Sequence, residues 1–136
     1  MIFVDTGPIV ARYLKNDQHH SRAISTWNSL EKNESEPLVI TSLVLAETAN
    51  LLAKRASPAF SAARATNILR SNVFQLIRPV LEIEEQALGF MERLSDQGVS
   101  FTDCVSFAAM KARGIRRVFT FDRHFDLLGF ERFPLT

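Results

Sequence analysis

The feature that most constrains the fold is the alternation of short apolar segments with longer amphipathic stretches. Five segments of four or five residues have the composition of buried strands, namely MIFVD (1–5), LVIT (38–41), VFQLI (73–77), RVFTF (117–121) and FERF (130–133). The stretches between the first four are long enough for helices, and such alternation is typical of a parallel sheet covered by helices on both faces. We therefore predict an α/β fold, a three-layer α/β/α sandwich with a mainly parallel sheet of four to five strands.

Local signals place the helices between these strands. Gly7-Pro8 suits a helix start, Ser42 is the expected N-cap of a helix that runs to about residue 56, and Pro58 begins another that ends near residue 70. Further helices are expected over 21–32, 82–94 and 102–113, the last one ended by Gly114. The polar stretch KNESEP (32–37) is expected to be a loop, and DRHFDLLG (122–129) a turn or short helix.

Composition limits the class of protein. The chain has 136 residues, of which 46% are hydrophobic and 23% charged, and its formal net charge is +1. These values predict one soluble domain over 1–136 without a broad basic surface. The single cysteine, Cys104, forms no internal disulfide and is expected in the core. The longest apolar stretch, residues 39–53, contains a glutamate and is shorter than the roughly 18 residues of a membrane span. With no basic, signal-like start, a cytoplasmic location is expected.

Two aspartates follow predicted strands directly. Asp5 ends the first apolar segment and Asp122 ends the fourth. Ligands of open parallel sheets bind beyond the carboxyl ends of the strands, so both carboxylates are candidates for a binding site. Each could instead cap the helix that follows, because aspartate is a favoured N-cap residue. The repetition of the pattern favours a shared site.

Two further acids lie on helices that must pack against the sheet. Glu47 has Leu43, Val44 and Leu51 three or four positions away, so it lies on or beside an apolar stripe, where an unpaired carboxylate is costly. A structural ion pair with a distant arginine is the alternative. Asp103 opens the mostly apolar helix TDCVSFAAMKA, where it could also serve only to complement the helix dipole.

A shared cation is the simplest common purpose of these four carboxylates. Carboxylates without matching histidine or cysteine ligands favour hard ions, Mg²⁺ or Mn²⁺, over zinc. The usual chemistry of several converging carboxylates with such an ion is phosphodiester cleavage, in which the ion polarises the phosphate and activates water. The sequence therefore predicts a metal-dependent nuclease.

Three stretches carry a resemblance to a known family. They are FVDTGPIVA (3–11), TSLVLAETANLL (41–52) and GVSFTDCVSFAAMKARGIRRVFTFDRHFDLLGF (98–130). Through them the chain resembles the PIN-domain nucleases, and specifically the VapC-like toxins of bacterial toxin–antitoxin pairs. The family's acidic site matches Asp5, Glu47, Asp103 and Asp122, which the resemblance implies are catalytic and metal-binding. Its supporting hydroxyls match Thr6 and Thr120.

The resemblance also implies an activity and partners. It implies an endoribonuclease that depends on Mg²⁺, for which Mn²⁺ can substitute, and that is inhibited by a cognate antitoxin and is commonly a homodimer. The helix 58–70 carries Ala59, Ala62, Ala63 and Ala65, small residues that allow close helix approach. Together with Phe60 and Leu51-Leu52 it is a candidate for a twofold contact and for an antitoxin groove, with ordinary intramolecular packing as the alternative.

Residues that contact RNA are less sharply defined. Basic side chains near the acids in sequence are the candidates for phosphate contacts, namely Arg12, Lys15, Lys54, Arg55 and Arg123. His19-His20 is interpreted as a polar helix start, and His124 either contacts RNA or lies in a solvated turn. The eleven phenylalanines and Trp27 are expected in the core or an interface and not in a platform that stacks bases.

Other protein classes fit the sequence less well. A phosphatase of the haloacid dehalogenase kind needs a second aspartate two residues after the first, where this chain has Gly7. A phospho-receiver domain needs paired acids before its phosphoacceptor, and that pattern is missing. The remaining alternative is a non-catalytic PIN-like module that only binds RNA or protein, and the four intact acids argue against it because buried carboxylates are costly to retain.

Overall fold

All five strands belong to one parallel sheet. The computed structural model describes residues 1–32 and 36–134, so the central part of the expected 32–37 loop, residues 33–35, lies outside the described residues. The strands are β1 (Ile2–Val4), β2 (Leu38–Thr41), β3 (Phe74–Ile77), β4 (Arg117–Phe119) and β5 (Glu131–Phe133). Their order is β3-β2-β1-β4-β5, and every neighbouring pair is parallel. The predicted α/β fold is confirmed, with five strands that are all parallel.

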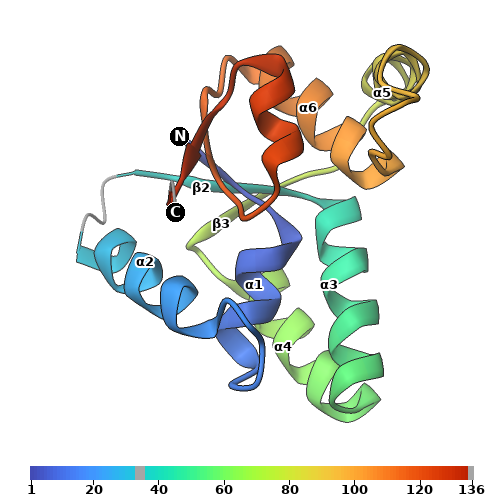
Figure 1. Ribbon diagram of the computed structural model, residues 1–136. Coiled ribbons are helices and arrows are strands. Elements are labelled where there is room, and N and C mark those ends of the chain that lie inside the picture. The colour runs from blue at the N-terminus through green and yellow to red at the C-terminus, as the bar shows by residue number, and fades with distance from the viewer. Residues whose placement is uncertain (33–35, 135–136) are drawn as a thin grey trace.

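Helices cover both faces of this sheet (Figure 1). Below the strands in that view lie α1 (Thr6–Tyr13), α2 (His20–Lys32), α3 (Ser42–Arg55) and α4 (Pro58–Arg70). Above them lie α5 (Leu81–Arg93) and α6 (Phe101–Arg113), which pack against each other. A short 3-10 helix, η1 (Arg123–Leu128), joins β4 to β5 and confirms the expected turn or short helix.

The direction of the chain reverses between the two halves of the sheet. From β1 it proceeds to β2 and β3 on one side, and then crosses back to β4 and β5 on the other side of β1. The strand order therefore switches between β1 and β4. Ligands of open α/β sheets bind beyond the carboxyl ends of the strands at such a point, and we call this region the crevice. Asp5 follows β1 and Asp122 follows β4, so both acids lie at this switch.

A continuous core holds the layers together. β1 and β2 are buried at every position, and Phe3, Phe107, Phe119 and Phe125 are among the largest side chains without solvent contact. α6 is buried from Cys104 to Met110, as its apolar sequence predicts. Cys104 is a core thiol as expected, and burial raises its pKa to about 11.

Several element boundaries differ from the expected ones by one or two residues, and two of them lie next to the candidate site. The N-cap of α3 is Thr41, whose Oγ1 accepts a hydrogen bond from the backbone N–H of Val44 at 3.2 Å, whereas Ser42 is the first helical residue. Threonine caps helices nearly as well as serine, so the sequence did not distinguish them. β4 ends at Phe119 and not at Phe121, because the chain leaves the sheet at Thr120 to form the loop that carries Asp122.

Candidate active site

One threonine hydroxyl connects the two acids that follow strands. Thr120 Oγ1 donates a hydrogen bond to Asp5 Oδ2 at 2.7 Å, and the same oxygen accepts one from the backbone N–H of Asp122 at 2.9 Å. Thr120 is completely buried and Asp5 is 6% exposed, so this connection is shielded from water. The predicted supporting hydroxyl therefore fixes the Asp5 carboxylate relative to the loop after β4.

Asp122 is held by the helix that it begins. It is the N-cap of η1, and its Oδ1 accepts a hydrogen bond from the backbone N–H of His124 at 2.9 Å. The His124 Nδ1 atom lies 3.0 Å from the same oxygen but without hydrogen-bond geometry, so this ring nitrogen has no partner among the described residues. Asp122 can therefore both cap η1 and take part in a site, because its Oδ1 orders the loop while the residue lies where the strand order switches.

Asp103 likewise has a local role and a place in the site. It is the third residue of α6 and forms a capping box with Ser100. Ser100 Oγ accepts a hydrogen bond from the backbone N–H of Asp103 at 3.0 Å, and Asp103 Oδ2 accepts one from the backbone N–H of Ser100 at 3.2 Å. The apolar body of α6 packs into the core and brings this first turn to the carboxyl ends of the strands. The capping box fixes the carboxylate at that position.

Glu47 reaches the site from the opposite face of the sheet. It lies in the first half of α3, is half-buried, and forms no ion pair among residues 1–32 and 36–134. α3 contacts α6, and the charge of Glu47 is close enough to act on Asp103. A distant structural ion pair, the alternative for this residue, is not what the structure shows.

The charges of Asp103 and Asp122 act on Asp5, and the charges of Asp122 and Glu47 act on Asp103. Burial, reinforced by the charges of Asp103 and Asp122, raises the pKa of Asp5 to about 7 against the opposing hydrogen bond from Thr120. Burial also raises the pKa of Asp103, and the charges of Asp122 and Glu47 add to the effect despite the Ser100 hydrogen bonds. Carboxylates whose charges act on Asp5 and Asp103 at close range are suitable surroundings for a cation.

The donor atoms present fit a divalent cation. One oxygen from each of Asp103 and Asp122 and one ring nitrogen of His124 lie within 4.8 Å of one another. Asp5 and Glu47 are outside this tight group but act on it electrostatically. A set dominated by carboxylate oxygens suits Mg²⁺ or Mn²⁺, and the histidine makes the site compatible with Mn²⁺ in particular. The hydroxyl of Thr6, the residue after Asp5, is buried and has no hydrogen-bond partner among the described residues.

The basic residues expected near RNA are dispersed. Arg12 points to the other end of the sheet, where its guanidinium pairs with Glu31 at 3.0 Å and stacks on Trp27. These side chains line a pocket of about 800 Å³ that also contains Leu38, the first residue of β2. Arg55, at the end of α3, pairs with Asp17 at 2.7 Å.

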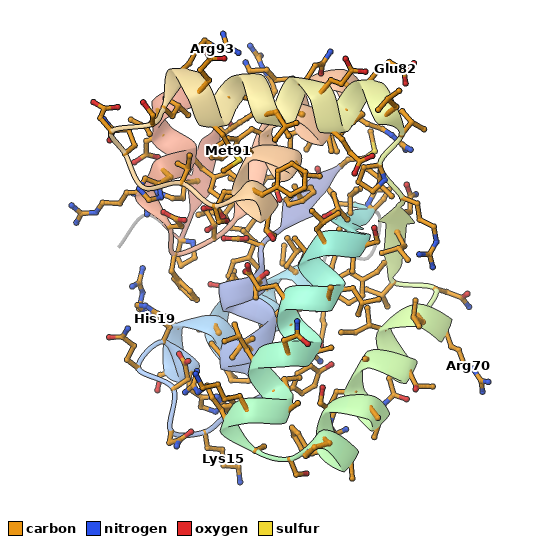
Figure 2. The ribbon with its side chains drawn as sticks, turned by 90° about the vertical axis from the view of Figure 1, so that its right-hand side faces the viewer. Lys15, His19, Arg70, Glu82, Met91 and Arg93 are labelled. Carbon is orange, nitrogen blue, oxygen red and sulfur yellow. The ribbon has the colours of Figure 1, made fainter. Side chains whose placement is uncertain are left out.

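The other three predicted RNA contacts are exposed. Lys15 and Lys54 lie near the ends of helices that run away from the strands, and Figure 2 shows Lys15 at the far end of the molecule from α5. Arg123 is exposed directly beside Asp122. Of the five, only Arg123 adjoins the acids in both sequence and space.

Three residues of this region were not assigned to the site from the sequence, namely His124, His19 and Phe121. His124 contributes a ring nitrogen to the tight donor group. His19 stacks on Phe121, the residue before Asp122, with ring centroids 4.3 Å apart and planes 17° apart. The sequence did contain a signal for His124, because it follows the last acid by two residues. Nothing local connects His19 with Phe121, which lies about one hundred positions later.

The parallel sheet, the strand switch and the acids beside it are those of a nuclease class, and comparison with known proteins agrees. The PIN domain family model matches residues 2–131, and the chain belongs to the PIN-domain family. The 23S rRNA-specific endonuclease VapC20 of Mycobacterium tuberculosis is 36% identical over 131 residues, which cover 96% of this chain and 95% of that protein. The predicted VapC-like character is thereby confirmed.

Solved structures support the same assignment. The crystal structure of M. tuberculosis VapC20, described as a sarcin-ricin loop cleaving toxin, superposes with a TM-score of 0.86 at 32% identity and covers 96% of each chain. VapBC2 from Rickettsia felis, bound to a DNA fragment from its promoter, gives a TM-score of 0.70 at 16% identity and covers 97% of each chain. At that identity the second likeness shows the shared fold alone. No helix in the described ranges is long and apolar enough to cross a membrane.

Proposed function

We propose that this protein is a metal-dependent endoribonuclease and the toxin of a toxin–antitoxin pair. The proposal is supported by the donor group of Asp103, Asp122 and His124 and by the charge interactions that connect Asp5 and Glu47 to it. The chain is also 36% identical to an rRNA-specific endonuclease. Because that relative acts on 23S rRNA and its structure is described as that of a sarcin-ricin loop cleaving toxin, an RNA hairpin with that loop is the first substrate to test.

The four acids have the roles of ion ligands in this proposal. Asp5, Asp103 and Asp122 hold Mg²⁺ or Mn²⁺, and Glu47 positions the ion or the attacking water. When bound, the ion polarises the scissile phosphate and lowers the pKa of a water molecule. The rigid supports of these side chains, Thr120 and the Ser100 capping box, keep the carboxylates in place before the ion arrives, which limits the reorganisation that binding requires.

Cleavage of the labelled hairpin tests the activity and its metal dependence. We expect cleavage in Mg²⁺ or Mn²⁺, none in EDTA, and recovery when the ion is restored. Asp5→Asn should abolish cleavage while the protein remains folded by circular dichroism, and the exposed loop variant Asp96→Asn is the matched control. Undiminished cleavage in EDTA would reject metal catalysis.

The same assay distinguishes the non-catalytic alternative. A PIN-like module that only binds would shift the hairpin in a gel without producing new ends, in any metal. Mapping of RNA ends after brief expression of the wild type and of Asp5→Asn extends the test to cellular RNA, where the wild type alone should generate new 5′ ends.

The partner proposals concern α4 and the antitoxin. The small residues Ala59, Ala62 and Ala63 are exposed on α4 and remain available for a contact. The expected contribution of Leu52 is wrong, because this side chain is fully buried, and Phe60 and Leu51 pack half-buried against the same core cluster. The surface of α4 remains our candidate for a twofold contact and for an antitoxin helix. A short reading frame directly upstream, whose product co-purifies with this chain and inhibits cleavage, is the expected antitoxin.

A further inference from the structure

Phe121 is an aromatic side chain at the crevice that the catalytic roles do not use. It directly precedes Asp122, is half-buried, and packs edge-on against the core ring of Phe119 with centroids 6.0 Å apart. Its Cδ2 lies 3.7 Å from where a Cβ on Gly7 would be, so the ring lies over the start of α1. Phe121 therefore forms a fixed surface between the Asp5 and Asp122 segments.

His19 covers this ring from the connection between α1 and α2. The two rings are stacked, 4.3 Å between centroids and 17° between planes. Figure 2 shows His19 at the margin of the molecule, on the outer side of the helices beneath the sheet. It is only half-buried, so part of its ring remains open to solvent.

The backbone at His19 is held in place by a charged anchor. Its N–H donates to Asp17 Oδ1 at 2.8 Å, and Asp17 Oδ2 accepts from Arg55 at 2.7 Å. The Asp17 side chain is only 13% exposed. The loop is thus attached to the end of α3, and a ring held in this way loses little conformational entropy on binding a ligand.

Arg22 completes the cluster from the first turn of α2. Its guanidinium carbon lies 5.0 Å from the centroid of Phe121. Arg12, Arg55, Arg117 and Arg132 each pair with a carboxylate, whereas Arg22 forms no ion pair within the part of the chain that the structure describes. A cation without a carboxylate partner, oriented by an aromatic ring next to a phosphodiester site, is suited to a phosphate group.

These contacts match the chemistry of single-stranded nucleic acid, which stacks bases on aromatic rings and places phosphates on cations. We propose that His19, supported by Phe121, stacks a base of the RNA next to the scissile phosphate, and that Arg22 holds an adjoining phosphate. This subsite rests on the proposed ribonuclease function and specifies where the unpaired nucleotide lies.

Binding and kinetics of matched variants test the subsite. The probes are a fluorescein-labelled sarcin-ricin hairpin and a labelled single-stranded RNA of random sequence, with Ca²⁺ in place of Mg²⁺ for anisotropy. We expect His19→Ala to weaken binding about tenfold and His19→Tyr, which keeps an aromatic ring, to restore most of it. Arg22→Gln should weaken binding about fivefold and reduce the slope of log affinity against log salt by about 1. In Mg²⁺ both losses should appear in KM and not in kcat.

Two controls and three outcomes complete the test. Gln18→Ala and Arg70→Gln change exposed residues, the second at a distant corner of the molecule, and should bind RNA like the wild type (Figure 2). Cleavage by the wild type with unchanged affinity and KM in His19→Ala and Arg22→Gln overturns the subsite and leaves the ribonuclease function intact. RNA binding that His19→Ala weakens, without cleavage by the wild type, overturns the proposed function and supports the subsite. Equal weakening by the Arg70→Gln control overturns the local role of Arg22.

Discussion

Asp5 allows a quantitative test of how the site is built. Its carboxyl is 6% exposed and its pKa is raised from 3.8 to about 7, first by burial and then by the charges of Asp103 and Asp122. The folded state therefore binds a proton at Asp5 more tightly than the unfolded chain does. Stability from this residue is fully present below about pH 4 and is lost as pH rises from about 4 to about 7.

The size of the effect follows from the shift. One pKa unit corresponds to about 1.4 kcal/mol, so a rise from 3.8 to about 7 costs at most about 4 kcal/mol of folding free energy at pH 8. Asp5→Asn removes this cost while its amide oxygen can still accept the hydrogen bond from Thr120. In EDTA at pH 8 the variant should therefore melt higher than the wild type, by a difference on the order of 10 °C.

Thermal melts in EDTA across pH 4 to 8 measure this difference. The stability gap between Asp5→Asn and the wild type should close as pH approaches 4, and the exposed control Asp96→Asn should follow the wild type at every pH. Added Mn²⁺ should stabilise the wild type at pH 8 and reverse the order, because the ion binds the ionised carboxylate. If Asp5→Asn melts below the wild type at pH 8 in EDTA, or the gap does not depend on pH, the electrostatic account of the site is refuted.

The remaining predictions address the neighbouring supports and the partner surface. Asp103→Asn should melt at or above the wild-type temperature in EDTA, gain less from Mn²⁺ and lose cleavage; a lower melt with retained cleavage would confine Asp103 to its capping box. Thr120→Val removes hydrogen bonds to Asp5 and Asp122 and should cost about 2 kcal/mol in urea unfolding as well as activity, whereas an unchanged midpoint would contradict the buried connection. Glu47→Gln should leave unfolding nearly unchanged and reduce cleavage at least tenfold, and full activity would remove it from the site. Ala62→Glu, on the exposed face of α4, should convert a dimer to a monomer in light scattering, and a wild type that is already monomeric at micromolar concentration would exclude the contact.

Much of the fold could be predicted because its signals are local. The apolar segments predicted the strands to within two residues, and Gly114, in the left-handed region with φ of 66°, ends α6 where the sequence placed its end. Asp5, Glu47, Asp103 and Asp122 could be predicted as a site because carboxylates beside buried strands and apolar stripes are costly. The residues Ser100 and Thr120 could be assigned their contacts only from the structure, because each partner depends on how a loop is oriented.

The sequence by itself determined the elements, their order along the chain and the four acids, since helix and strand periodicity and the cost of burying charge are readable residue by residue. Only the tertiary structure decided which of these elements meet. Arg12 follows Asp5 by seven residues, yet α1 carries it away from the crevice at about 1.5 Å per residue, to a pocket with Trp27 and Leu38. His19 and Phe121 are far apart in sequence but stack at 4.3 Å, because β4 pairs with β1 and brings the loop after β4 to the helices that follow β1. Strand pairing is a non-local choice, and the proposed RNA subsite depends on it.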